Sequence, residues 1–380
     1  MRYLLFFALG LTSMATATPP RVAVGYLADH SDAPVEGVPW KDLTHVCHAY
    51  LQLDGLGMPI ASETVPSAEL AETAHGRGVK ILLTVGAGQT TLGLETITKD
   101  PLATTTFARA LARRIAEVGY DGVDLAWESP RNKQTREGFT AMLAALRQEL
   151  DTVSKGRAEP LLLTAQVSPS PFFMKWIDGP KVAPLVDWLN VAAYDMCGPY
   201  DRTAAHHAPL FPSPKDPERS WRSVSGAMTR WHEDAGVPKD KLVMGLPMFG
   251  RIYPVEAPYQ PLDAERRNQH GAYTYTRINE LVSSGAPAEW DDPSKAPWLR
   301  PTGEPTQVIA YDDRNSIHLK AAWAHDEGYR GYYFWALGQD RMPDGSNWLV
   351  RAATKAWPAE QPAPEDPAPT PAVKRPAPSP

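Results

Sequence analysis

Asp124 and Glu128 lie four residues apart in the stretch 121–128, whose sequence is DGVDLAWE. Its regular alternation predicts a strand in which Asp124, Ala126 and Glu128 point to one face and the apolar residues between them to the other. An acid at the end of an inward-facing strand is costly unless it is paired or solvated. We therefore expect Glu128 to have a functional role and not a structural one. Asp124, on the same face, would favour the protonated form of Glu128 by like-charge repulsion.

The rest of the chain is organised to position this stretch. Apolar runs alternate with helical patterns, among them 68–75, 107–118 and 139–150, which is typical of repeated βα units. The predicted strands are 22–26, 43–50, 79–85, 121–128, 161–167, 188–194, 242–247 and 329–335. Eight such units in one α/β domain predict a (β/α)8 TIM barrel, with the active site at the C-terminal ends of the strands.

One interval is too long for a single helix. Between the seventh and eighth strands, about 252–309, lie an aromatic alternating run at 272–276 and a helix-like pattern at 277–282. We interpret this interval as a small α+β insertion that walls one side of the cleft.

Several motifs, in order along nearly the whole of 18–357, resemble glycoside hydrolase family 18, the chitinases. The stretch 121–128 is similar to the family's D-G-x-D-x-D-x-E, except that Ala126 stands where the family has its middle aspartate. Further similar segments are 190–195 (NVAAYD), 198–201 (GPYD), 207–210 (HAPL), 245–251 (GLPMFGR), 290–291 (WD), 296–298 (APW), 311–320 (YDDRNSIHLK) and 334–337 (FWAL). The third strand departs from the family's S-x-G-G, because it ends in Thr-Val-Gly-Ala at 84–87.

The resemblance implies a substrate-assisted retaining mechanism, in which the sugar's own acetamido group attacks the anomeric carbon. Glu128 would protonate the leaving oxygen with help from Asp124, and Tyr194 would donate to the acetamido carbonyl. The implied sugar-binding residues are Tyr26, Asp195, Arg251 and Trp335. Purely structural roles are the alternatives for three of these residues. Trp335 could belong to the barrel core, Tyr26 could pack at the bottom of the barrel, and Arg251 could form a structural ion pair.

Ala126 cannot accept the acetamido N–H or balance a positive intermediate, as the family's aspartate does. The loss of one such electrostatic partner typically lowers turnover ~10²–10³-fold. Three functions follow: a weakened secreted chitinase-like hydrolase, a lectin that has lost turnover, and a fold reused for protein contacts. The retained acids favour the hydrolase, the altered positions favour the lectin, and nothing specific favours the third.

The two ends of the chain have their own signals. Residues 1–17 have Arg2, an apolar run and the sequence Ala-Thr-Ala, which predicts a secretory signal, with an uncleaved anchor as the alternative. Residues 358–380 hold nine prolines and predict an extended or disordered tail. We expect an exported, soluble monomer without a membrane span.

Composition limits the partners. The formal charge is −6, and −7 once Arg2 is removed with the signal, which argues against nucleic acid or an anionic membrane. Chitin or N-acetylglucosamine oligosaccharides are the implied ligands, and no cofactor or metal site is expected. Cys47 and Cys197 could pair in an exported protein, but they belong to strands far apart around the barrel. The adjacent His206 and His207 are expected to face solvent in a loop.

Overall fold

The computed structural model describes residues 20–29, 34–86, 90–127, 130–217, 221–304 and 306–357, apart from the side chain of Arg267. Glu128, the expected signal at 1–17 and the expected tail at 358–380 lie outside the described residues.

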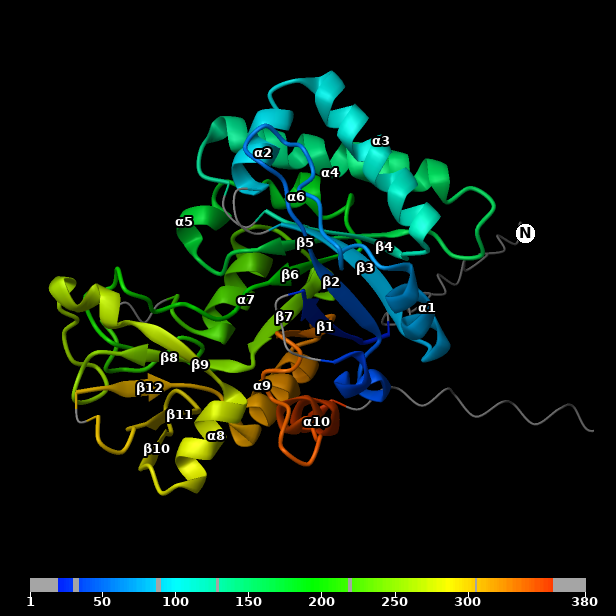
Figure 1. Ribbon diagram of the computed structural model, residues 1–380. Helices are drawn as coiled ribbons and strands as arrows, with labels where there is room; N and C mark the ends of the chain where they lie inside the picture. The colour runs from blue at the N-terminus through cyan, green and yellow to red at the C-terminus, as the bar shows by residue number, and fades with distance from the viewer. Residues whose placement is uncertain are drawn as a thin grey trace, which may run out of the picture.

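Eight parallel strands close into a barrel in the order β1-β13-β7-β6-β5-β4-β3-β2, with helices packed around it (Figure 1). This confirms the predicted (β/α)8 fold. The barrel strands are β1 (Val22–Ala28), β2 (His45–Leu51), β3 (Lys80–Gly86), β4 (Gly122–Ala126), β5 (Leu162–Val167), β6 (Trp188–Val191), β7 (Leu242–Pro247) and β13 (Gly331–Trp335). The predicted strand at 121–128 is thus shorter, and so is the one at 188–194.

The short form of β6 has a local cause. After Val191 the chain turns tightly, because Ala193 N–H donates to the Val191 carbonyl and Tyr194 N–H to the Ala192 carbonyl. Asp195 then adopts a left-handed backbone with φ of 56°. Ala192 N–H still donates to the Val167 carbonyl of β5, and the chain leaves the sheet at residues 193–194.

The two faces of β4 follow the predicted alternation. Val123, Leu125 and Trp127 are fully buried in the large outer core between the barrel and its helices. Asp124, also fully buried, points into the barrel interior. The smaller inner cluster contains Val24, Tyr26, Cys47, Leu82 and other residues of the same inward parity.

The helices begin and end at residues suited to those places. α3 starts with the Asp100 cap and Pro101, and ends at Gly119 with φ of 89°; α4 starts with a capping box on Asn132. The barrel helices are α1 (Ala68–Gly76), α2 (Thr90–Ile97), α3 (Pro101–Val118), α4 (Lys133–Val153), α5 (Pro171–Met174), α6 (Gly179–Val182), α7 (Val224–Glu233), α9 (Arg314–Asp326) and α10 (Trp348–Ala356). Short 3-10 turns are η1 (Val35–Gly37), η2 (Trp40–Asp42), η3 (Lys239–Lys241) and η4 (Ala264–Gln269).

A second, antiparallel sheet lies beside the barrel, with the strand order β10-β11-β12-β8-β9 (Figure 1). It is built between β7 and β13, as the sequence predicts. Its elements are β8 (Phe249–Tyr253), β9 (Gly271–Thr274), α8 (Tyr275–Ser283), β10 (Ala288–Asp291), β11 (Ala296–Leu299) and β12 (Val308–Ala310). Its first strand, β8, begins at Phe249, so that only Met248 separates it from the end of β7.

Two further features bear on the expectations from sequence. Within the described ranges, no helix combines the length and the apolar character needed to cross a membrane. Cys47 and Cys197 are both buried, and both are free thiols.

Candidate active site

Asp124 is the centre of a hydrogen-bonded cage inside the barrel. Its Oδ2 accepts from Tyr26 Oη at 2.8 Å and from Thr84 Oγ1 at 3.3 Å. Its Oδ1 accepts from Thr164 Oγ1 at 2.6 Å and from Asn190 Nδ2 at 3.1 Å. All four donors are neutral, and together they occupy the acceptor sites of both oxygens.

Register explains how four strands supply this cage. Thr84 on β3 and Thr164 on β5 are the direct partners of Asp124 across the neighbouring strands. Asn190 comes from β6 and also donates to Tyr26 Oη at 3.0 Å, which links the cage into one network. The side chain of Asp124 is therefore fixed in place by the rigid wall of the barrel.

Burial and hydrogen bonding act on the pKa of Asp124 in opposite directions. Burial raises the pKa of Asp124, and the hydrogen bonds from Thr164, Tyr26, Asn190 and Thr84 only partly oppose that shift. No cation pairs with Asp124 among the residues that the structure describes. A buried carboxyl without a cation is suited to holding or exchanging a proton.

Ala126 lies one step above Asp124 on the same strand face and is partly exposed. Its partner on β3 is Gly86, where an added Cβ would be 2.5 Å from the Ala126 Cβ and 3.3 Å from Tyr50 Cδ1. A side chain at position 86 would therefore collide with Ala126, and glycine permits the close approach of the two strands. Glu128, two residues further along, lies outside the described residues.

Aromatic rings line the interior next to this strand. Tyr26 is fully buried, and its ring lies 5.4 Å from that of Trp335, which is itself partly exposed. Tyr50 contacts the other part of Trp335, with ring centroids 5.8 Å apart. Tyr26 thus supports Asp124 from below, and its contact with a sugar stays a prediction.

Tyr194 is the third predicted catalytic residue and lies just after β6, two strands away from β4 around the barrel. Its hydroxyl accepts from Tyr333 Oη at 3.0 Å and from Gln166 Nε2 at 3.5 Å. Its ring packs edge-on against Phe249, with centroids 5.8 Å apart, and its side chain is only 7% exposed. The tyrosine is held rigidly from β5, β13 and β8.

At the rim, Asp195 and Arg251 form a two-point ion pair. Arg251 Nε and Nη2 donate to the two Asp195 oxygens, each at 2.6 Å. Although burial acts to raise it, the hydrogen bond from Arg251, reinforced by that from His207, lowers the pKa of Asp195 to about 2. Both side chains stay about 40% exposed, so the pair can also meet a polar ligand.

His206 and His207 were expected to face solvent, and this prediction is wrong. Both are buried, because the second sheet and Phe249 cover their loop. His206 stacks on Trp298 at 4.1 Å and contacts the Asp291 carboxylate, while His207 Nδ1 lies 3.6 Å from Asp195 Oδ1. The loop thereby joins the barrel rim to the insertion.

The structure adds site residues that sequence reasoning did not select: Thr84, Thr164, Asn190, Tyr50 and His207. Each of the first three is a polar side chain within a mainly apolar strand, and that is the signal that could have identified them. Tyr50 lies within a register irregularity between Ala49 and Leu51, which has no signal in the sequence. The described residues contain no cluster of three or more metal-ligating side chains.

Comparison with known proteins agrees with this architecture. A family model described as glycosyl hydrolases family 18 matches residues 22–340. Chitinase A1 of Niallia circulans is 27% identical over an aligned length of 333 residues, and the match covers 81% of this chain and 46% of that protein. The chain thus spans less than half the length of that relative.

Two solved structures are similar over most of their length. A class V chitinase from Nicotiana tobaccum in complex with NAG4 is 25% identical, with a TM-score of 0.77, covering 89% of this chain and 99% of that one. A chitinase-like agglutinin from Robinia pseudoacacia is 26% identical, with a TM-score of 0.75, covering 88% and 99%. The family model spans most of the chain, and the chain belongs to the glycosyl hydrolases of family 18.

Proposed function

We propose that this protein is a chitinase-like hydrolase that cleaves β-1,4-linked N-acetylglucosamine polymers or oligomers by a substrate-assisted, retaining mechanism. The observation that carries the proposal is the caged Asp124, which lies on β4 at the position expected of a family 18 active site. Active sites of such barrels lie at the C-terminal ends of the strands, and β4 leads directly to Glu128.

The proposed roles follow the walls of the site. Glu128 protonates the leaving oxygen and later activates water, and Asp124 supplies or takes up a proton on the same strand face. Tyr194 donates its hydroxyl proton to the acetamido carbonyl, while its oxygen continues to accept from Tyr333 Oη. Trp335 forms the apolar floor under the sugar, since part of its ring is exposed.

Asp195 and Arg251 bind sugar hydroxyls or the acetamido group at the rim. Their ion pair leaves lone pairs and N–H groups facing outward, because both side chains are about 40% exposed. In this role the pair fixes the substrate and takes no part in proton transfer, since Asp195 with a pKa of about 2 stays ionised at working pH.

Ala126 makes this a weak enzyme in the proposal. Without a carboxylate there, the acetamido group loses a partner for its N–H and a counter-charge for the positive intermediate. Loss of one preorganised partner corresponds to a ~10²–10³-fold lower turnover. The fixed Asp124 lies one step below and compensates for the missing charge only in part.

The second candidate is a chitin-binding lectin that has lost turnover. The similarity to a chitinase-like agglutinin supports it, as does Ala126. In this version Trp335, Tyr194 and the Asp195–Arg251 pair bind the oligosaccharide, and Glu128 has no partner for catalysis. A lectin would have less reason to keep the acid, and for that reason we favour the hydrolase.

The apolar N-terminal run and small-residue site at 1–17 support export of the protein, and we propose that it works outside the cytoplasm as a monomer. The NAG4 bound to a 25% identical chitinase supports chito-oligosaccharides as the ligand.

One sample can separate the two functions. The mature protein and its Glu128→Gln variant are incubated with chito-oligosaccharides, and calorimetric affinity and product release are measured together. We expect turnover in the native protein that is lost in the variant while binding is kept. If both proteins bind tightly and neither releases product, the protein is a lectin. If neither protein binds the oligosaccharide, both candidate functions are rejected.

A further inference from the structure

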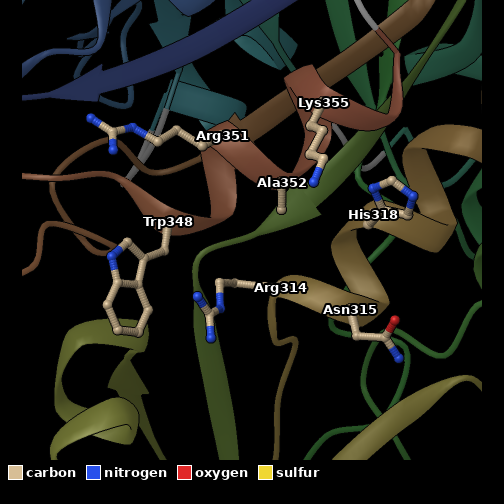
Figure 2. A pocket seen from close by; sticks show the side chains of 7 residues that line it. All are labelled: Arg314, Asn315, His318, Trp348, Arg351, Ala352 and Lys355. Carbon is tan, nitrogen blue, oxygen red and sulfur yellow. The ribbon is translucent and has the colours of Figure 1, made fainter.

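A basic groove lies on the outer surface between α9 and α10, away from the cage of Asp124 (Figure 2). Its volume is about 500 Å³. Cationic and imidazole side chains surround an apolar strip formed by Trp348 and Ala352; the lining residues are Arg314, Asn315, His318, Trp348, Arg351, Ala352 and Lys355.

The groove has a cationic side chain at each end and apolar side chains between them. The Arg314 guanidinium lies over the Trp348 ring, 4.5 Å from its centroid, at one end. At the other end the Lys355 ammonium points between Ala352 and His318, while Arg351 is directed away from the group (Figure 2). Trp348 and Ala352 are half-buried between these two cationic ends.

The cations of the groove have no acidic partner in the ion pairs that the structure describes. Neither Arg314 nor Lys355 takes part in one, although the formal charge of the chain is −6. The neighbouring Asp313 is already used as the cap of α9, where it accepts from Ser316 N–H at 2.8 Å. The groove therefore offers two separated positive ends to an anionic partner.

The chain leaves α10 beside this groove. The two helices run parallel, because Arg314 meets Trp348 near their first residues and His325 meets Trp357 at their last, with ring centroids 5.2 Å apart. Trp357 is the last described residue, one short step beyond Lys355. Whatever follows Trp357 starts at the Lys355 end.

The sequence that follows is complementary to the groove. Residues 358–366 read PAEQPAPED, with three acids, three prolines and no base before Lys374. Proline-rich segments are extended and dock on aromatic-lined grooves, and carboxylates pair with exposed arginine and lysine. We propose that segment 358–366 of this chain binds in the α9–α10 groove, with its prolines on Trp348 and Ala352.

The distances allow this arrangement. Glu360 is three residues past Trp357, a reach of up to ~10 Å, which is enough for Lys355. From Glu360 to Glu365 an extended proline-rich chain spans ~15 Å. Lys355 and the Trp348–Arg314 end are separated by seven helical residues, ~10 Å along α10. The acids of the segment thus match both cationic ends, with Glu365 and Asp366 at Arg314.

The test uses the full chain carrying Arg314→Lys, which keeps the charge and provides an amine far in sequence from the segment. A zero-length carbodiimide joins amines to carboxylates in contact, and mass spectrometry of the monomeric band locates the bonds. We expect bonds from position 314 to Glu365 or Asp366 several times more often than bonds from Lys133, an 84% exposed lysine on α4. The proposal also predicts their loss in 1 M salt, because exposed ion pairs are screened.

Two controls make the result decisive. Adding Lys355→Gln, which leaves the amine at 314 in place, should lower these bonds, whereas adding Lys133→Gln should not. In the native chain, the triple change Glu360→Gln, Glu365→Gln and Asp366→Asn should increase hydrogen exchange at residues 348–356. Equal bonding at 314 and Lys133, or exchange that the triple change leaves untouched, would overturn the proposal. These outcomes do not depend on the hydrolase proposal.

Discussion

The cage inside the barrel and the rim above it hold their aspartates in opposite ways. Asp124 is fully buried and receives only neutral donors, so burial raises its pKa. Asp195 is 40% exposed and receives a two-point bond from Arg251, and its pKa falls to about 2. Burial acts to raise the pKa of both acids, and the hydrogen-bonded cation beside Asp195 is what reverses the direction there.

A third acid breaks this comparison, because Asp312 combines burial with a cation. Its two oxygens accept from Lys320 Nζ, both at 2.6 Å, and both side chains are at most 2% exposed. Lys320→Met leaves the carboxylate buried without its partner, and we expect it to lower the free energy of unfolding by about 3–5 kcal/mol. Denaturant unfolding measures this.

The control for that prediction is an exposed pair of similar length. Arg300 Nη2 and Glu289 Oε1 are 3.0 Å apart, with side chains 46% and 59% exposed. Arg300→Met should cost less than about 1 kcal/mol. If both substitutions cost the same, burial would not be what makes the Asp312–Lys320 pair important.

The next largest effect concerns the cage itself. Asp124→Asn keeps the shape but removes the charge and the exchangeable proton of the carboxyl, so we expect turnover of chito-oligosaccharides to fall ~10²–10³-fold. Affinity measured by calorimetry should change much less. Asp121→Asn, at the outer end of the same segment, is the matched control and should keep native turnover. If affinity falls as much as turnover, Asp124 acts in substrate binding and not in the chemical step.

At the rim the pattern should reverse. Asp195→Asn removes one of two partners for a polar ligand, and we expect KM to rise roughly tenfold while kcat changes little, as for a binding contact made equally in both states. Arg251→Ala should act in the same way. Because the two side chains share one ion pair, the double variant should be no worse than either single one. Additive losses would show that they bind separately.

Acid titration should give the smallest effect and the clearest sign. The folded pKa of Asp195 is depressed from 3.8 to about 2, so its contribution to stability is present above 3.8 and is lost as pH falls through 2. The folded pKa of Asp124 is raised, so its contribution is present below 3.8 and is lost as pH rises. We therefore expect the free energy of unfolding, measured with denaturant, to fall less between pH 5 and pH 2 in Asp195→Asn than in the native chain. In Asp124→Asn it should fall more than in the native chain. Equal curves would contradict the comparison.

Much of the fold could be predicted from the sequence, because each barrel strand is an apolar run and apolar runs identify buried strands. Strand ends were less predictable. The last residues of 188–194 are as apolar as the strand, but a tight turn after Val191 takes them out of the sheet. The local hydrogen bonds of that turn, which no pattern in the sequence marks, determine where β6 stops.

The site was predictable where one segment carries it and not where several segments meet. Asp124 follows from the alternation of 121–128, whereas Thr84 and Thr164 become its partners only through register across β3, β4 and β5. His206 and His207 have the composition of an exposed loop, and only the second sheet and Phe249 bury them. Contacts between distant segments leave no local pattern.

The most direct test of the account is the turnover of Ala126→Asp. The substitution places a carboxylate one step above Asp124, on a partly exposed strand position opposite Gly86. We predict that product release from chito-oligosaccharides rises ~10²–10³-fold, and that adding Glu128→Gln abolishes the gain. Turnover that stays unchanged or falls, in a variant that folds and still binds the oligosaccharide, would contradict the claim that this is a family 18 hydrolase limited by its alanine.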